Sequence, residues 1–160
     1  MEDLAANPDS ATADAEKAED AELRGELQRT AVGGTLLHGE TTATILGAFY
    51  AVHSELGFGF LEAVYANALV VLLKHAGLRV ERQIPFEIQF HGHNVGHYRA
   101  DLVVESRVIV EVKAGRCIIP QHTAQVLNYL RASRLRVGLL LNFGEKAEFK
   151  RVVWTRSPPR

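Results

Sequence analysis

The sequence predicts an α/β domain in which two helices precede three strands, a third helix and a last strand. Three observations support this order. Apolar residues recur every three or four positions between residues 41 and 75, they alternate with polar residues over 86–90, and Pro120 opens a further helical segment before an apolar run at 136–143. The chain has 160 residues, of which 47% are hydrophobic, which suits one domain with one core.

The first helix is predicted over residues 41–56. Its buried face is marked by the spacing of Ile45, Phe49, Val52 and Leu56. Thr41 or Thr42 is expected as the N-cap, because a threonine hydroxyl can accept a free N–H of the first turn.

The second helix is predicted over residues 60–75. The run Gly57-Phe58-Gly59 separates it from the first helix, and Gly77 offers the left-handed conformation that ends many helices. Glu62 therefore lies in its first turn.

Beyond Gly77 the apolar period changes from nearly four residues to two, which indicates strands. The first strand covers 86–90 and extends back to Val80 if the chain kinks at Pro85. A turn is expected at 91–94. The remaining elements are strands over 95–104, 108–114 and 136–143, and a helix from Pro120 to about Ser133.

The formal net charge of −1 hides an uneven distribution. Residues 1–29 hold nine acidic and three basic residues, a net charge of −6, so residues 30–160 carry +5. We predict a disordered acidic tail over 1–35, because its first 29 residues have almost no large apolar side chains. The domain is expected over 36–155, with a second tail at 156–160. Its basic charge admits a phosphate-bearing partner.

The sequence contains one cysteine, Cys117, which excludes a disulfide framework or an all-cysteine metal site within the chain. The N-terminal segment lacks the basic and apolar pattern of a signal peptide, and the longest apolar runs are too short to span a bilayer. We expect a cytoplasmic protein without a membrane partner.

Charged residues meet at the end of a predicted buried strand. Glu111 and Lys113, two residues apart, share one face of that strand. A three-residue loop over 105–107 would pair residue 104 with 108 and place Asp101 opposite Glu111, whereas a two-residue loop would turn Asp101 to the other face, so we predict the odd-length loop.

Two facing carboxylates repel each other unless a proton or a cation lies between them, and such oxygen ligands suit Mg²⁺ or Mn²⁺. Lys113 beside that cation could orient or deprotonate an attacking water, or stabilise charge on a phosphoryl oxygen.

Asp101 and the run Glu111-Val112-Lys113 resemble the D…(D/E)-x-K signature of the PD-(D/E)XK nuclease superfamily. The resemblance covers about residues 42–153. It implies a restriction-endonuclease-like α-β-β-β-α-β core with a mixed central sheet flanked by helices, preceded here by one extra helix.

Two further motifs carry the resemblance. Gly59-x-x-Glu62-x-x-Tyr65 resembles the motif of the GxxExxY family within this superfamily, and Gln125-x-x-x-Tyr129 resembles the QxxxY motif of RecB-type members. Ala100 stands where a Pro or Gly usually precedes the aspartate, and Tyr98 stands where RecB-type members commonly have Gly.

The resemblance implies roles for particular residues. Lys113 would be the catalytic lysine, and Gln125 and Tyr129, which share one helix face, would close over the site and help to hold Lys113 or the nucleic-acid backbone. The implied metal ligands, direct or through water, are Glu62, Asp101, Glu111 and the Val112 carbonyl.

Basic side chains bracket this site in the sequence and could contact substrate phosphates. The expected substrate-binding residues are Arg99, Arg116, His122 and Gln125, and the arginines Arg131, Arg134 and Arg136 are further candidates. Together these features predict a Mg²⁺- or Mn²⁺-dependent nuclease that hydrolyses phosphodiester bonds in nucleic acid, with DNA as the expected substrate. A homodimer is possible.

Several alternatives remain open on the sequence alone. Asp101 could be a surface carboxylate and Glu111–Lys113 a plain ion pair. The domain could be an inactive nuclease-fold module that binds nucleic acid or protein, and the acidic tail could dock over its basic face. Zinc binding by His91, His93 and His97 is a weak option, because no cysteine accompanies them. Packing is at least as good a role for Tyr65 as catalysis, and His53 suits helix packing.

Overall fold

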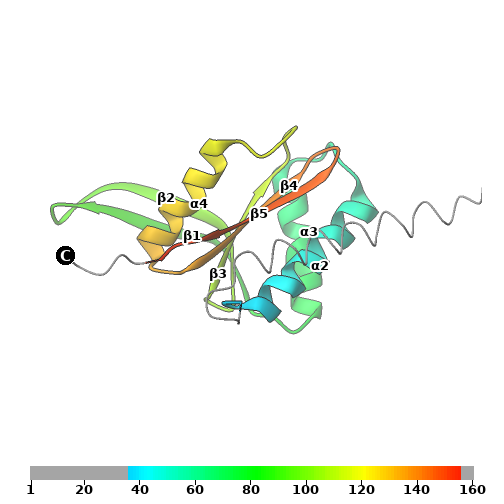
Figure 1. Cartoon of the computed structure of the whole chain (residues 1–160), viewed down its shortest axis with the longest axis horizontal. Coiled ribbons are helices and arrows are strands. Elements are labelled where there is room, and N and C mark those ends of the chain that lie inside the picture. Colours follow the sequence, from blue (N-terminus) through cyan, green and yellow to red (C-terminus); the bar gives the residue numbers. More distant parts are fainter. Residues whose placement is uncertain (1–35, 156–160) are drawn as a thin grey trace, which may run out of the picture. The chain divides into compact units, whose positions relative to one another are not determined.

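The computed structural model describes residues 36–155 of the chain, and the predicted tails at 1–35 and 156–160 lie outside these residues. The described part contains three helices and five strands (Figure 1). In chain order they are α2 (Gly39–Leu56), α3 (Glu62–His75), β1 (Val80–Phe90), β2 (His93–Val104), β3 (Val108–Lys113), α4 (Pro120–Ser133), β4 (Val137–Phe143) and β5 (Ala147–Val153).

The five strands form one sheet in the order β1-β2-β3-β4-β5. β3 and β4 run parallel, and every other neighbouring pair is antiparallel, so the sheet is mixed as predicted. α4 connects the parallel pair, because two parallel strands need a long crossover between their ends. The α/β class and the predicted order of the first seven elements are confirmed.

The eighth element, β5, was not predicted. It pairs antiparallel with β4 and forms an edge of the sheet. Charged residues interrupt its apolar pattern, and one of them, Arg151, is only 6% exposed. The alternation of apolar and polar residues that marks a strand is therefore broken in this segment.

Helices cover both faces of the sheet. On one face α4 packs through Val126 and Leu130 onto Ile109 and Leu140. The helix approaches β4 so closely that a Cβ atom at Gly138 would lie 2.5 Å from Val126 Cγ1, so only glycine fits there.

Aromatic rings build the core on the other face of β4, because successive side chains of a strand point to opposite faces. The Phe143 ring meets the α2 ring of Phe49 edge-on at 4.8 Å and stacks on the α3 ring of Tyr65 at 4.2 Å. Within residues 36–155 no helix is both long and apolar enough to cross a membrane.

The helix ends differ from the prediction in two places. α2 begins at Gly39, before the expected caps Thr41 and Thr42, because a turn closed by the Gly39 N–H to Leu36 O bond of 3.0 Å starts the helix earlier. α3 begins at Glu62 rather than residue 60, which keeps Glu62 in the first turn as expected. Gly77 has a φ of 81°, in agreement with its predicted role at the helix end.

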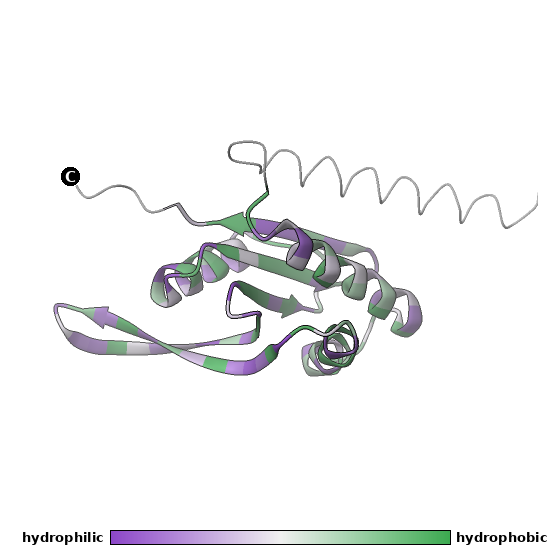
Figure 2. Ribbon diagram, turned by 90° about the horizontal axis from the view of Figure 1, so that it is seen from below, coloured by the Kyte–Doolittle hydropathy of each residue, from purple (hydrophilic) through white to green (hydrophobic). Residues whose placement is uncertain are grey.

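The β1–β2 hairpin is longer than predicted. β1 starts at Val80. It is irregular at Gln83, which has a φ of 52°, and between Ile88 and Gln89, where its register with β2 shifts, rather than at Pro85. Pro85 is accommodated because β1 is an edge strand. β2 begins at His93, so the turn is shorter than 91–94. Only the last three residues of β2 pair with β3, and the hairpin extends beyond them as a two-stranded ribbon (Figure 2).

The β2–β3 turn has the predicted odd length. Val104 pairs with Val108, which leaves three residues, 105–107, in the loop. The ladder continues to Leu102 and Val110 and ends there, one pair before Asp101 and Glu111.

Candidate active site

β3 carries the two central residues of the site at its C-terminal end. Glu111 is 3% exposed, and Lys113 Nζ donates a 2.9 Å hydrogen bond to Glu111 Oε1. The other carboxylate oxygen, Oε2, is buried and has no hydrogen-bond partner among the described residues. A buried carboxylate oxygen without a donor is costly, so this atom can take a ligand that brings positive charge.

Asp101 is held beside Glu111 by the backbone of β3. Its Oδ2 accepts the Val112 N–H at 2.8 Å, at the point where the β2–β3 ladder has ended. The Asp101 carboxylate thus accepts a backbone N–H of β3 beyond the end of the β2–β3 pairing. This contact fixes the Asp101 side chain close to Glu111, as the predicted register required.

The electrostatics of Glu111 follow from this arrangement. Burial and the nearby Asp101 carboxylate raise the pKa of Glu111 to about 7, and Lys113 and the Asp101 backbone act in the opposite direction. The lysine and this backbone group therefore do not compensate for the burial of Glu111 beside a second carboxylate. The donor set of Asp101 and Glu111 fits a hard divalent cation, because both offer carboxylate oxygens and Glu111 Oε2 is unpaired.

Glu62, the third predicted carboxylate ligand, is exposed in the first turn of α3. Across residues 36–155, no three His, Cys, Asp or Glu side chains are close enough together to hold a metal ion. The structure thus brings Asp101, Glu111 and Lys113 together but leaves Glu62 outside a ligand cluster. Glu62 still lies near His122, because its negative charge acts on the pKa of that ring in the direction opposite to Lys113.

Gln125 and Tyr129 share one face of α4, as predicted, and are bonded to each other. Gln125 Nε2 donates to the Tyr129 hydroxyl at 2.7 Å, and that hydroxyl donates to Arg99 O on β2 at 3.2 Å. Burial and the negative charges of Glu111 and Asp101 raise the pKa of Tyr129 to about 12. The phenol therefore stays protonated near the two carboxylates and ties α4 to β2.

The remaining predicted residues surround this centre. Arg99 on β2 and Arg116 between β3 and α4 are both exposed, whereas Val112 on β3 is fully buried. The ring of His122 turns towards the start of its own helix, where Nδ1 accepts the Ile119 N–H at 3.4 Å. Burial and the positive charge of Lys113 lower the pKa of His122. The lowered pKa favours a neutral ring beside Lys113.

Two residues that support the site were missed from the sequence. Asn142, fully buried on β4, accepts the Gly115 N–H at 2.9 Å and donates to Gly115 O at 3.0 Å. Glu148, its partner on β5, accepts the Ile118 N–H at 3.0 Å. Together they fix the chain after Lys113. A single asparagine within an apolar strand is the sequence signal that could have found Asn142.

Tyr65 and His53 have packing contacts. The Tyr65 ring is fully buried, and its hydroxyl donates to Gly57 O at 2.8 Å and accepts the Phe60 N–H at 3.2 Å. Tyr65 therefore holds the loop before α3. His53 Nε2 lies 2.9 Å from Gly144 O, which joins α2 to the turn after β4.

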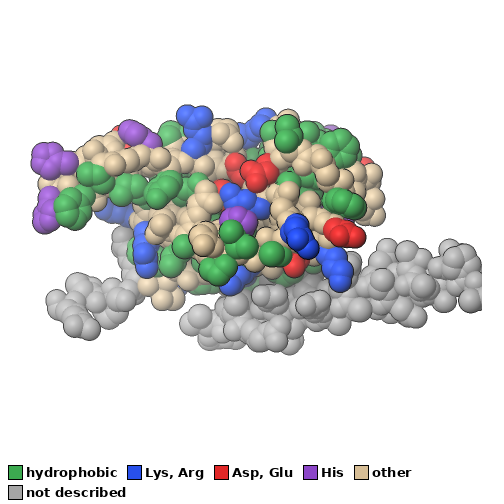
Figure 3. Space-filling view, turned by 90° about the horizontal axis from the view of Figure 1, so that it is seen from above, with side chains coloured by type: hydrophobic (Ala, Val, Ile, Leu, Met, Phe, Trp, Pro, Cys, Tyr) green, Lys and Arg blue, Asp and Glu red, His purple; other side chains and the backbone are tan. Residues whose placement is uncertain are grey.

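The three histidines considered for zinc lie near the outer end of the hairpin. Figure 3 shows histidine side chains there, away from the acidic side chains near the middle of that face. The lack of a metal-binding group among the described side chains applies to His91, His93 and His97 as well, so the geometry gives no support for zinc.

Comparison with known proteins identifies the class to which this fold and site correspond. The family model of the PD-(D/E)XK nuclease superfamily matches residues 39–152, and the chain belongs to this superfamily.

Among solved structures, the chain is similar to one described as "Crystal structure of SSO0001", with a TM-score of 0.47 and 19% sequence identity. The match covers 75% of this chain and 60% of that one, so the chain spans less than two thirds of the length of that protein. No curated protein matches the sequence.

Proposed function

We propose that this protein is a metal-dependent nuclease that hydrolyses phosphodiester bonds in nucleic acid, with DNA as the preferred substrate. The observation that carries the proposal is the buried Glu111 carboxylate, whose Oε2 lacks a partner and whose neighbours are Asp101 and Lys113. Membership of a nuclease superfamily supports it.

Asp101 and Glu111 would hold Mg²⁺ or Mn²⁺, with the Val112 carbonyl and a water-mediated contact to Glu62 as the further ligands that the superfamily pattern implies. When bound there, the ion would supply Lewis-acid stabilisation of negative charge on a phosphoryl oxygen.

The chain's own residues have distinct tasks in this proposal. Glu111 Oε1 orients the Lys113 ammonium, which would then orient the attacking water or stabilise charge on the phosphate. Gln125 and Tyr129 keep α4 against β2 and close one side of the site. Arg99 and Arg116 are exposed nearby and would contact the flanking phosphates.

A cleavage screen tests the proposal. Purified protein is incubated with single-stranded, duplex, flapped and branched DNA, and with RNA, in Mg²⁺ or Mn²⁺. We expect cleavage by the wild type and loss of cleavage in Lys113→Ala and Glu111→Gln. Lys74→Ala on α3 and Glu55→Gln on α2 are matched controls, because both residues are exposed. Equal cleavage by the Lys113 and Glu111 variants would refute the assignment.

A second candidate is an inactive nuclease-fold module that binds nucleic acid or protein. It is favoured by the position of Glu62, which leaves two carboxylates together in the described part of the chain. Calorimetry with Mn²⁺ separates the two functions. A divalent-ion site that Asp101→Asn removes supports the nuclease, whereas no heat of binding in the wild type supports the module.

A further inference from the structure

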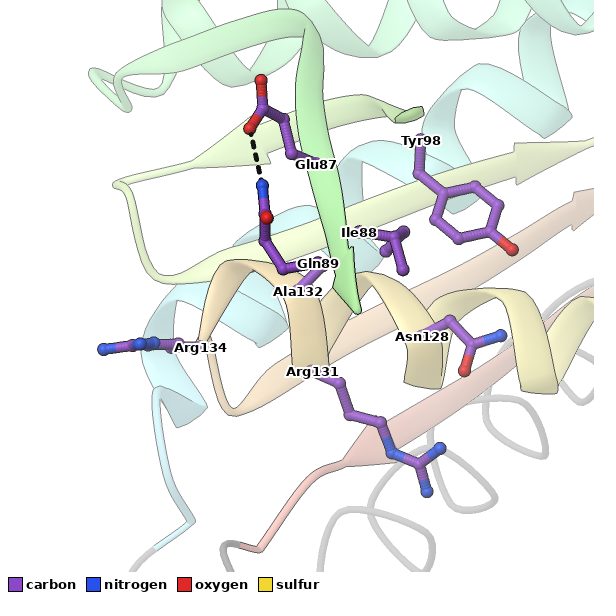
Figure 4. A pocket seen from close by; sticks show the side chains of 8 residues that line it. All are labelled: Glu87, Ile88, Gln89, Tyr98, Asn128, Arg131, Ala132 and Arg134. Atoms are coloured by element: carbon purple, nitrogen blue, oxygen red, sulfur yellow. Dashed lines mark hydrogen bonds between the residues drawn. The ribbon is translucent and has the colours of Figure 1, made fainter. Parts of the chain in front are cut away.

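A groove lies between the β1–β2 hairpin and α4, outside the cluster of Asp101, Glu111 and Lys113. We call it the hairpin groove, and its volume is about 480 Å³. Figure 4 shows its lining, which comes from β1, β2 and α4 together with the residue that ends α4. The lining residues are Glu87, Ile88, Gln89, Tyr98, Asn128, Arg131, Ala132 and Arg134.

The hairpin groove begins where the active site ends. The Tyr98 ring meets the Tyr129 ring edge-on, with centroids 5.3 Å apart, and Tyr129 is close enough to Glu111 and Asp101 for their charges to raise its pKa. On α4, Gln125, Asn128 and Arg131 follow one another at three-residue spacing. This row covers about 9 Å from the active site into the groove.

The chemistry of the lining combines a flat apolar surface with positive charge. The Tyr98 side chain is 39% exposed, and Ile88 lies diagonally across the hairpin from it. Arg131 and Arg134 are both exposed. Figure 4 shows Arg131 and Arg134 further along the lining, with their side chains directed away from Tyr98. An aromatic surface with positive charge further along the same groove suits an unpaired strand, with one base stacked on the ring and the phosphates of neighbouring nucleotides neutralised.

The one acidic residue of the lining does not oppose this use. Alternation along β1 places the Glu87 side chain on the face opposite Phe86 and Ile88. Its Oε2 accepts a 3.0 Å hydrogen bond from Gln89 Nε2, and Figure 4 shows this pair well separated from Tyr98 and Asn128.

We infer that the hairpin groove binds the single-stranded part of the substrate next to the scissile phosphate, with one base stacked on Tyr98. Within a duplex the bases are paired and stacked on one another, so only a terminal pair has a free base face for this ring. The inference rests on the proposed function, because the strand is placed by its scissile phosphate at Asp101 and Glu111. It adds a substrate class, nucleic acid with an unpaired segment.

Binding measured without cleavage tests this inference. Fluorescence anisotropy in EDTA compares a labelled single-stranded DNA of about 15 nucleotides with the same sequence as a blunt duplex. We expect the wild type to bind the single strand more tightly. Tyr98→Ala should weaken single-strand binding about tenfold and change duplex binding little, whereas Tyr98→Phe, which keeps the ring, should bind like the wild type.

Phe90→Ala is the matched control, because Phe90 is a 62% exposed aromatic residue on the same hairpin but outside the groove lining. The inference is overturned if the duplex binds as tightly as the single strand, if Phe90→Ala matches Tyr98→Ala, or if Tyr98→Phe is as weak as Tyr98→Ala.

The cleavage screen in Mn²⁺ distinguishes failure of the proposed nuclease activity from failure of the proposed groove. Binding that depends on Tyr98 in a protein that cleaves nothing supports the groove and refutes the nuclease. Cleavage that Tyr98→Ala leaves unchanged on every substrate, together with unchanged binding, refutes the groove alone.

Discussion

The candidate active site and the hairpin groove differ in how far their charged side chains are exposed to solvent. In the candidate active site Glu111 is 3% exposed, Asp101 is fixed by the Val112 N–H, and burial together with the Asp101 charge raises the pKa of Glu111. In the groove Arg131 and Arg134 are exposed. Buried charges interact strongly and cost free energy to keep, whereas exposed charges are screened by solvent. Substitutions in the first region should therefore change catalysis and stability, and those in the second should change binding.

The largest expected effect is at Asp101. Asp101→Ala and Asp101→Asn should both lower the cleavage rate by at least about a hundredfold, because each removes a carboxylate charge from the centre. Asp101→Ala should also lower the free energy of unfolding by about 1–2 kcal/mol, since the buried Val112 N–H loses its acceptor. Asp101→Asn keeps an acceptor oxygen and should be more stable than Asp101→Ala. Rates and urea unfolding measure the two effects, and equal stability of both variants would contradict the role of this bond.

The second effect is the pH dependence of the metal-free protein. The pKa of Glu111 in the folded state, about 7, lies above its ordinary value of 4.5. Between these values the folded protein holds a proton that the unfolded chain has released, so wild-type stability should fall as pH rises and level off above about pH 8.

Glu111→Gln removes this titration. In EDTA at pH 8 it should therefore be more stable than the wild type, by on the order of 3 kcal/mol, and the difference should vanish near pH 4. Glu87→Gln, at an exposed position, should show no such trend. Urea unfolding at several pH values measures it, and a pH-independent difference would contradict the buried-carboxylate interpretation.

The third effect is at Asn142, which supports the candidate active site without being one of its predicted catalytic residues. Asn142→Ala removes both hydrogen bonds to Gly115 and should cost about 2 kcal/mol of unfolding free energy. It should also slow cleavage about tenfold, because the chain that follows Lys113 loses its anchor. Asn94→Ala is the control, since Asn94 is exposed near the hairpin turn. An Asn142→Ala protein with full activity would show that this anchor does not position Lys113.

The sequence was informative where local signals agree with the tertiary structure. Periodicity and Pro120 predicted both ends of α4. The alternation around Glu111 and the odd-length loop after β2 predicted that Asp101 and Lys113 lie beside Glu111. It failed at β5, where the buried Arg151 breaks the apolar pattern, and at the start of α2, where a local turn precedes the threonines.

The supporting contacts of the site could not be predicted for a different reason. The bonds from Asn142 to Gly115 and from Glu148 to Ile118 join residues 27 and 30 positions apart. Which segments meet at such separations depends on the strand order, which periodicity alone does not give. The hairpin groove likewise depends on how α4 lies across the ribbon. The sequence therefore marked Arg131 and Arg134 as candidate phosphate contacts but could not predict the groove that they line.

The smallest expected effect is on the salt dependence of single-strand binding. If Arg131 contacts one phosphate in the hairpin groove, Arg131→Ala should reduce the slope of log K against log salt concentration by about 0.7. Binding should weaken by a similar factor for different sequences, because a phosphate contact carries no base information. Anisotropy titrations between low and moderate salt measure the slope. Arg107→Ala, in the exposed β2–β3 turn, is the matched control and should leave it unchanged. A slope that both variants reduce equally would mean that general positive charge, rather than the groove, attracts the strand.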